Sequence, residues 1–231
     1  MEYYDKEFCL EVWGPMACFT RPEFKVERVS YDVITPSAAR AIFEAILFKK
    51  YAMKWQVTKI EVLKPIKWTN IRRNEVCATA SVVTQNPLYI EGDLRQQRNT
   101  LLLKDVCYRI WAKLMYIRVA DRPKKAFEKH TPGADENPMK YYRMFERRAS
   151  MGQCFCQPYL GTREFSASFK LVDPEKDILK APIPDSRDFG FMLYDMDYEI
   201  DETDPKAMFY RAKMDHGVII VPSKISKEVL R

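Results

Sequence analysis

The chain has 231 residues, of which 47% are hydrophobic and 13% aromatic, a composition typical of a folded protein with one domain or slightly more. It contains no apolar run of the roughly 18 residues that a transmembrane helix needs, and its N-terminus lacks the features of a signal peptide. We therefore expect a soluble, cytoplasmic protein without a membrane partner. The net charge of +6 is compatible with a polyanionic partner but does not establish one.

Six cysteines are spread along the chain, at positions 9, 18, 77, 107, 154 and 156. A disulfide framework is favoured in short secreted chains, and this chain is neither short nor visibly exported. Cys154 and Cys156 form a C-x-C pair, but a tetrahedral zinc site needs two more ligands, and the only histidines are His130 and His216. We therefore expect buried, reduced thiols, no metal and no cofactor.

The first half of the chain predicts a strand, a helix and a second strand. Residues 7–13 alternate apolar and polar side chains, which indicates a strand. Thr35 can cap a helix and Pro36 suits its first position. Residues 55–62 alternate again and predict the next strand. The expected apolar stripe of the helix consists of Ala38, Ala41 or Ile42, Ala45 and Phe48.

The second half repeats the pattern after a polar insertion. Residues 69–104 are rich in Asn, Arg and Gln, and we expect an irregular excursion or a long hairpin. Residues 105–116 form the clearest strand of the chain, with alternate residues on two faces. Asn137 and Pro138 predict the start of a second helix, and Gly152 its end. Residues 165–171 alternate and predict a fourth strand.

The order strand, helix, strand, strand, helix, strand is the ferredoxin-like pattern shared by RRM domains, an α+β fold. We assign residues 1–172 to this domain, with a long insertion at about 69–104. Residues 173–231 form a β-hairpin-rich extension, with a predicted hairpin of residues 208–214 and 218–221 that turns at Asp215-His216-Gly217. Such folds host many functions, so the fold alone does not select one.

Several ordered segments carry a family resemblance. They are residues 12–23 (VWGPMACFTRPE), 26–33, 35–40, 71–76, 95–98 and 191–198 (FMLYDMDY), and above all 152–165 (GQCFCQPYLGTREF). Together they resemble the subtype I-C (Dvulg) Cas-five family, RAMP-type proteins of CRISPR systems.

The resemblance implies a metal-independent endoribonuclease that cuts precursor CRISPR RNA at the repeat hairpin by attack of a 2′-hydroxyl. It also implies that the protein stays on the 5′ handle, within a surveillance complex that contains Cas-seven and Cas-eight type subunits. A non-catalytic RNA-binding subunit is the alternative. Metal-dependent nicking of double-stranded DNA is a weaker alternative, because it needs clustered acidic residues and Asp195 and Asp197 are better explained as strand or turn residues. DNA binding through the basic surface alone stays open.

The family uses a tyrosine on the first helix and a Lys-His pair at the start of the second. Lys140 matches the lysine, whereas Tyr141 stands at the histidine position and Leu47 at the tyrosine position. Tyr51, four residues after Leu47, is a candidate replacement for the missing phenol. His130, on the loop before the second helix, has a suitable unperturbed pKa.

Lys140 is also a candidate on physical grounds. In the first turn of a helix, backbone N–H groups and a lysine can hold a phosphate together. A solvated surface lysine is the alternative reading, and for Tyr141 the alternative is a residue that rests on the core.

Eight residues are candidates for RNA binding. Arg109, Trp111 and Lys113 alternate on one strand face, where basic and aromatic groups suit phosphate contact and base stacking, unless the tail covers that face. The others lie in the insertion or after the second helix, where solvated loop residues or a pair between Arg163 and Glu164 are the alternatives: Arg72, Arg73, Arg95, Arg98 and Arg163.

Overall fold

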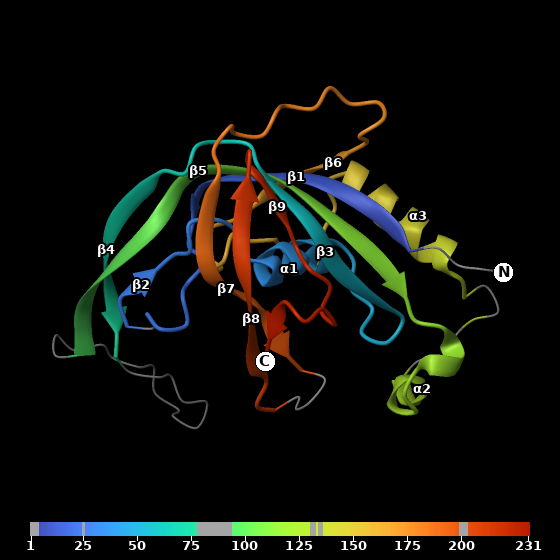
Figure 1. Ribbon diagram of the computed structural model, residues 1–231. Coiled ribbons are helices and arrows are strands. Elements are labelled where there is room, and N and C mark those ends of the chain that lie inside the picture. The colour runs from blue at the N-terminus through green and yellow to red at the C-terminus, as the bar shows by residue number, and fades with distance from the viewer. Residues whose placement is uncertain (1–4, 25, 78–93, 130–132, 134–135, 199–202) are drawn as a thin grey trace.

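One antiparallel sheet dominates the structure, a computed structural model that describes residues 5–24, 26–77, 94–129, 133, 136–198 and 203–231. Its centre has the spatial order β3 (Met53–Val62), β5 (Arg95–Tyr116), β1 (Lys6–Ala17), β6 (Ser168–Val172). Two helices, α1 (Pro36–Ile46) and α3 (Pro138–Ser150), follow β1 and β5 in the chain, so the six predicted elements occur in the predicted order. Figure 1 shows the sheet arched over α1.

Both helices cover the same face of the sheet. Phe43 of α1 stacks on Phe145 of α3 with ring centroids 5.7 Å apart, and Phe8 of β1 and Trp55 of β3 contact the Phe145 ring at 4.8 and 4.6 Å. The alternation of β1 and β5 directs Leu10 and Ile110 to this core as well, and both are fully buried. The predicted division of β5 into two faces is confirmed.

The capping residues predicted for the two helices are confirmed. The side chain of Thr35 accepts a hydrogen bond from the N–H of Ala38, and that of Asn137 accepts one from Lys140. Gly152 follows α3 with φ of +66°, a conformation that favours glycine. The predicted stripe of α1 was wrong at its end, because α1 ends at Ile46 and leaves Phe48 beyond the helix, 49% exposed.

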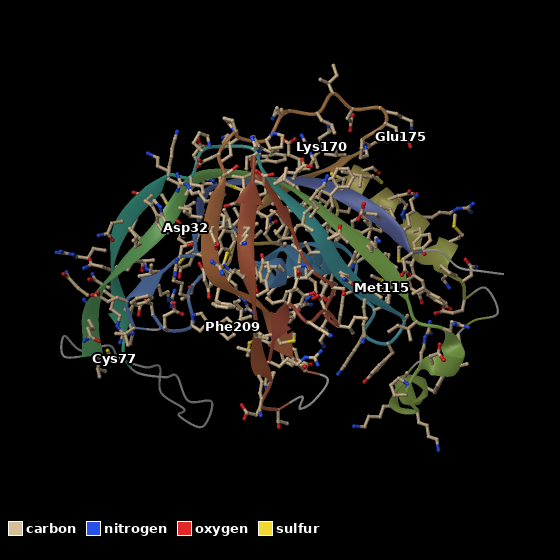
Figure 2. The ribbon with its side chains drawn as sticks, viewed as in Figure 1. Asp32, Cys77, Met115, Lys170, Glu175 and Phe209 are labelled. Atoms are coloured by element: carbon tan, nitrogen blue, oxygen red, sulfur yellow. The ribbon has the colours of Figure 1, made fainter. Side chains whose placement is uncertain are left out.

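The predicted insertion contains a long β-hairpin. Strand β4 (Trp68–Val76) pairs with the first part of β5 in an antiparallel manner. The short β2 (Arg28–Val29) pairs with the same part of β5 in parallel. Residues 78–93, at the tip, lie outside the described residues. Figure 2 places Cys77, near the tip, and Met115, at the other end of β5, on opposite sides of the molecule.

The C-terminal strands are β7 (Arg187–Asp197), β8 (Lys206–Asp215), β9 (Val218–Ile220) and β10 (Val229–Leu230). The predicted hairpin at Asp215 is confirmed: β8 pairs with β9, and His216 and Gly217 turn the chain with φ of +46° and +74°. Strand β9 also pairs with β3, which joins these strands to the main sheet.

A short segment links β5 to α3 through the 3₁₀ helix η2 (Val119–Asp121) and the helix α2 (Lys125–Lys129). Figure 1 shows α2 and α3 on the side of the molecule opposite β4. Within the described ranges, no helix is long and apolar enough to cross a membrane.

All six cysteines are free thiols, but they are not all buried. Cys77 and Cys156 are exposed and Cys154 is partly exposed, so the expectation of buried thiols was wrong for these three. In the part of the chain that the structure describes, no three His, Cys, Asp or Glu side chains are grouped so that they could hold a metal ion.

Candidate functional site

A groove of about 400 Å³ lies where the turn after α1, the segment around α2 and the start of α3 meet. Three of the predicted catalytic residues, Tyr51, Lys140 and Tyr141, line it together. The fourth, His130, lies outside the described residues. The charged residues of the lining are four cations and one acid: Lys49, Lys50, Arg122, Lys140 and Glu136.

The turn after α1 brings Tyr51 to the groove instead of Leu47. Leu47 is fully buried at the C-terminal end of α1, and its carbonyl accepts a hydrogen bond of 2.9 Å from the indole of Trp55. The N–H of Ala52 then donates to the carbonyl of Lys49, which closes a tight turn before β3. The ammonium of Lys50 lies 5.4 Å from the centroid of the Tyr51 ring, so a cation and a phenol are adjacent here.

The first turn of α3 presents the Lys140 side chain but few free backbone amides. Pro138 has no N–H, and the N–H of Lys140 donates to the Asn137 side chain at 3.1 Å. The cap therefore uses one of the N–H groups expected for the phosphate and Pro138 supplies none, while the cradle itself stays a prediction. A phosphate in this groove would be held by cationic side chains.

A buried carboxylate organises the wall of the groove. One oxygen of Glu136 accepts hydrogen bonds from Arg122 at 2.7 Å and from the Tyr141 hydroxyl at 2.5 Å. The side chains of Arg122 and Glu136 are only 5% and 6% exposed. Arg122 also donates to the carbonyl of Ile117, so Glu136 ties the end of β5 to the start of α3.

These contacts fix the protonation states of the wall. Burial and the adjacent Glu136 carboxylate raise the pKa of Tyr141 well above its usual range. Burial opposes ionisation of Glu136, but the hydrogen bonds from Tyr141 and Arg122 outweigh it and lower the pKa of that carboxyl. At neutral pH Tyr141 is therefore a neutral donor to a carboxylate, which makes it a poor general base.

The arrangement suits an anionic substrate. With four cations against one carboxylate, and that carboxylate already bound to Arg122 and Tyr141, Lys49, Lys50 and Lys140 dominate the field of the groove. Cations at such a position stabilise the charge that develops on a phosphate during transesterification. Tyr51 adds a phenol that can exchange a proton.

The predicted RNA-binding face of β5 is only partly open. Arg109 is 2% exposed, pairs with Glu61 at 2.6 Å and donates to the carbonyl of Lys180 in the C-terminal segment. The prediction that Arg109 contacts RNA was wrong, because this segment covers it. Trp111 is half-buried under the ammonium of Lys59, 4.0 Å from its ring, whereas Lys113 is exposed.

The arginines of the β4–β5 hairpin lie on its two faces. Arg73 and Arg98 share one face and pair with Glu75, and Arg73 also pairs with Glu164. Arg72 and Arg95 point to the opposite face and are exposed. Arg163 is exposed too, on the loop that precedes β6, and its neighbour Glu164 pairs with Arg73 of the hairpin and Arg28 of β2 rather than with it.

Sequence reasoning missed Lys49, Lys50, Arg122 and Glu136. The pair Lys49-Lys50 beside Tyr51 was a readable signal of a basic turn, since three polar residues follow an apolar helix. Arg122 and Glu136 are 14 residues apart in a polar loop, and no periodicity connects them. Only the folded chain brings them together.

Comparisons with known proteins agree with the sequence motifs. The family model Cas_Cas5d, described as CRISPR-associated protein (Cas_Cas5), matches residues 8–222. The chain belongs to this family. A relative from Mannheimia succiniciproducens, named CRISPR pre-crRNA endoribonuclease Cas5d, is 45% identical over 96% of this chain and 97% of its own. A relative of the same name from Thermus thermophilus is 36% identical over 96% and 94%.

Solved structures support the fold of this Cas5d-family chain. One described as a CRISPR-associated protein superimposes over the whole of both chains with a TM-score of 0.69 at 22% sequence identity. A functionally uncharacterized protein from Streptococcus mutans does so with a TM-score of 0.66 at 19% identity. At these identities the likeness extends to the fold only.

Proposed function

We propose that this protein is a CRISPR pre-crRNA endoribonuclease that cuts the repeat RNA in the groove at the start of α3. One observation carries the assignment of the site: the groove gathers Lys140, Tyr51 and the Lys49-Lys50 pair from segments far apart in the chain. The activity follows from two relatives of nearly full length, both named as pre-crRNA endoribonucleases.

The proposed reaction uses the 2′-hydroxyl of the RNA as nucleophile on the adjacent phosphate. The 2′ oxygen forms a bond to phosphorus, the bond to the 5′ oxygen breaks, and the products are a 2′,3′-cyclic phosphate and a 5′-hydroxyl. Lys140, with Lys49 and Lys50, stabilises the charge on the phosphate. Tyr51 is the proposed proton-transfer group, and His130 a further candidate.

Tyr141 has a different role in this proposal. Its hydroxyl is bound to Glu136, which is bound to Arg122, and this chain of contacts fixes the start of α3. Tyr141 is thus a positioning residue that holds the backbone of its neighbour Lys140 at the groove.

A non-catalytic RNA-binding subunit is the second candidate function. The observation that favours it is the burial of Leu47 at the family's tyrosine position, together with the engagement of Tyr141 at the histidine position. In that case the cations of the groove hold a 5′ handle without cutting it.

The fold and the partners complete the proposal. The strand order β6-β1-β5-β3, with both helices on one face, is the order expected of a ferredoxin-like domain. The proposed RNA contacts are the exposed Arg72, Arg95, Lys113 and Arg163. Cas-seven and Cas-eight type subunits are the proposed protein partners, and exposed apolar side chains at Phe48, Met151 and Phe155 offer a surface for them.

The test is single-turnover cleavage of the cognate repeat RNA in EDTA by the wild-type protein and by Lys140→Ala. We expect one cut by the wild type. In the variant, the cutting rate should fall about 100-fold or more, with RNA binding largely kept. Lys176→Ala, at a lysine whose side chain is 81% exposed in the C-terminal segment, is the matched control and should cut at the normal rate. Normal cutting by Lys140→Ala would remove Lys140 from the mechanism, and binding without cutting by the wild type would establish the second candidate.

A further inference from the structure

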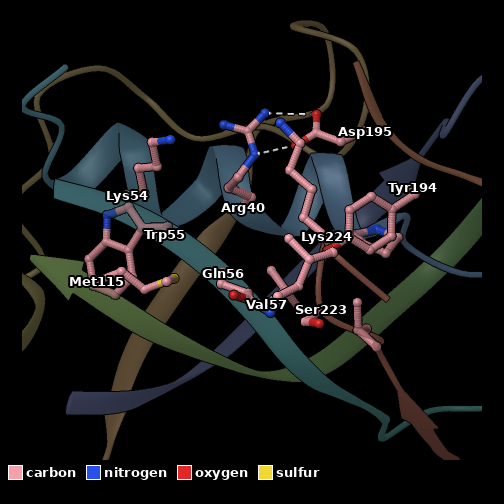
Figure 3. Close-up of a pocket in the computed structure, with 13 residues that line it drawn as sticks. Arg40, Lys54, Trp55, Gln56, Val57, Met115, Tyr194, Asp195, Ser223 and Lys224 are labelled. Atoms are coloured by element: carbon pink, nitrogen blue, oxygen red, sulfur yellow. Dashed lines mark hydrogen bonds and ion pairs between the residues drawn. The ribbon is translucent and has the colours of Figure 1, made fainter. Parts of the chain in front are cut away.

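A second hollow, of about 340 Å³, lies beside the outer edge of β3. We call it the β3 slot. It is bounded by the start of α1, by β3 residues 54–57, by β7 and by residues 221–225. Figure 3 shows Lys54 and Lys224 on opposite sides of the slot and Arg40 between them. Its volume falls at the lower end of the range for small-ligand sites, about 300–1,000 Å³.

The guanidinium of Arg40 is fixed in the wall of the slot. Asp195 binds it in a bidentate manner, with distances of 2.8 Å to Nε and 2.9 Å to Nη2, and Glu44 binds Nη1 at 2.5 Å. All three nitrogens thus donate within the plane of the group, as the dashed lines in Figure 3 show for Asp195. Three of the five N–H groups of Arg40 are thus engaged, and RNA bases stack on the flat face of such a group.

The rest of the slot suits the other parts of a nucleotide. Met115 and Val57 give apolar walls, and Ile225, at the rim, is 89% exposed and would be covered by a bound base. Lys54 and Lys224 supply cations at the rim, although Lys224 also pairs with Asp197. In the described part of the chain, strand β9 pairs with β3 only at residues 59–61, so no strand occupies the edge at 54–57.

The slot lies next to the proposed cleavage groove. Ala52 lines the groove and Lys54 lines the slot, a separation of about 7 Å at the usual rise of a strand. Met115 lines the slot, and the ring of its neighbour Tyr116 lies 5.9 Å from that of Tyr141 in the groove wall. At this separation, a nucleotide in the slot lies only a few positions along the strand from a phosphate in the groove.

We propose that the β3 slot holds one unstacked nucleotide of the RNA close to the cut, with its base on the face of Arg40 and its phosphate near Lys54 or Lys224. This inference rests on the proposed function, because it assumes that RNA enters the neighbouring groove. The slot acts in binding and in retention of the cut RNA, whereas the groove carries the chemistry.

Ser223→Trp tests the proposal, because Ser223 lines the slot on a partly exposed loop and the indole fills it. We expect the Kd for the cut repeat RNA to rise about tenfold or more, while the single-turnover cutting rate at saturating protein stays within about threefold. Ser150→Trp, at an exposed position near the end of α3, is the matched control and should leave both values unchanged. The melting temperatures of both variants must equal that of the wild type.

A second readout locates the nucleotide directly. Repeat RNAs with 4-thiouridine at single positions near the cut should cross-link to residues 221–227 of the wild type from one or two positions, and not to Ser223→Trp. The proposal would be overturned if Ser223→Trp bound the RNA as tightly as the wild type and no such cross-link formed. Loss of binding to a protein subunit by Ser223→Trp, with RNA affinity unchanged, would also count against it. A wild type that neither binds nor cuts repeat RNA would refute the proposed function itself, which separates the two failures.

Discussion

Glu136 is the residue whose removal should most damage the wall of the proposed cleavage groove. In Glu136→Ala, Arg122 keeps only its hydrogen bond to the Ile117 carbonyl, at 3.1 Å, and the Tyr141 hydroxyl loses its acceptor. The guanidinium then remains buried, since its side chain is 5% exposed, without a compensating charge.

The expected cost follows from that burial. Breaking a buried ion pair by removing one partner costs about 3–5 kcal/mol, and we take about 3 kcal/mol because groove water can reach the vacated space. For a chain of this size each kcal/mol lowers the melting temperature by about 2–4 °C, so the variant should melt about 6–12 °C below the wild type.

Glu146→Ala is the matched control, because Glu146 lies on α3, the helix that Glu136 precedes, but pairs with Lys6 at a site where both side chains are more than 40% exposed. Such a pair contributes about 0–1 kcal/mol. The assay is thermal unfolding followed by circular dichroism at neutral pH. If Glu136→Ala melted within about 2 °C of Glu146→Ala, the triad of Arg122, Glu136 and Tyr141 would not organise the groove.

Three further predictions follow from the same geometry. The lowered pKa of Glu136 means that its contribution to stability is present above the unfolded pKa of about 4.3 and is lost as the pH falls through its folded pKa. The difference in melting temperature between the wild type and Glu136→Gln should therefore shrink below about pH 4; a constant difference would contradict this. Tyr51→Phe should slow single-turnover cutting about tenfold or more with RNA affinity kept, and an unchanged rate would exclude proton transfer by its hydroxyl. Arg109→Ala should lower stability by about 1.5–3 kcal/mol in denaturant unfolding, because the buried Glu61 loses one of its two cations and keeps only Lys59, at 2.8 Å. Lys113→Ala should leave stability unchanged and weaken RNA binding in filter assays.

Local patterns predicted the elements of the fold well. The caps Thr35 and Asn137, the alternation of β1 and β5, and the turn at Asp215 depend on neighbours in the chain, and each is present in the structure. The end of α1 was less predictable. Whether Phe48 continues the helix or leaves it depends on the burial of Leu47 and its bond to Trp55, which are tertiary contacts.

The site was predicted in part, for the same physical reason. Lys140 and Tyr51 were identified, and the structure brings them into one groove. The partners that tune the groove, Arg122 and Glu136, meet only after folding, and so do Arg40 and Asp195, which are 155 residues apart. Arg109 shows the opposite error: on strand alternation alone it resembles the exposed Lys113, and only the C-terminal segment that covers it makes it a core residue.

The most direct test of the account is a single 2′-deoxy substitution in the repeat RNA, at the nucleotide whose 2′-hydroxyl would attack. The substitution removes the nucleophile and leaves the phosphate that Lys140, Lys49 and Lys50 are proposed to hold. We predict that this RNA binds with the affinity of the unmodified repeat and is not cut. Cutting at the normal rate would contradict attack by the 2′-hydroxyl and, with it, the chemistry assigned to the groove.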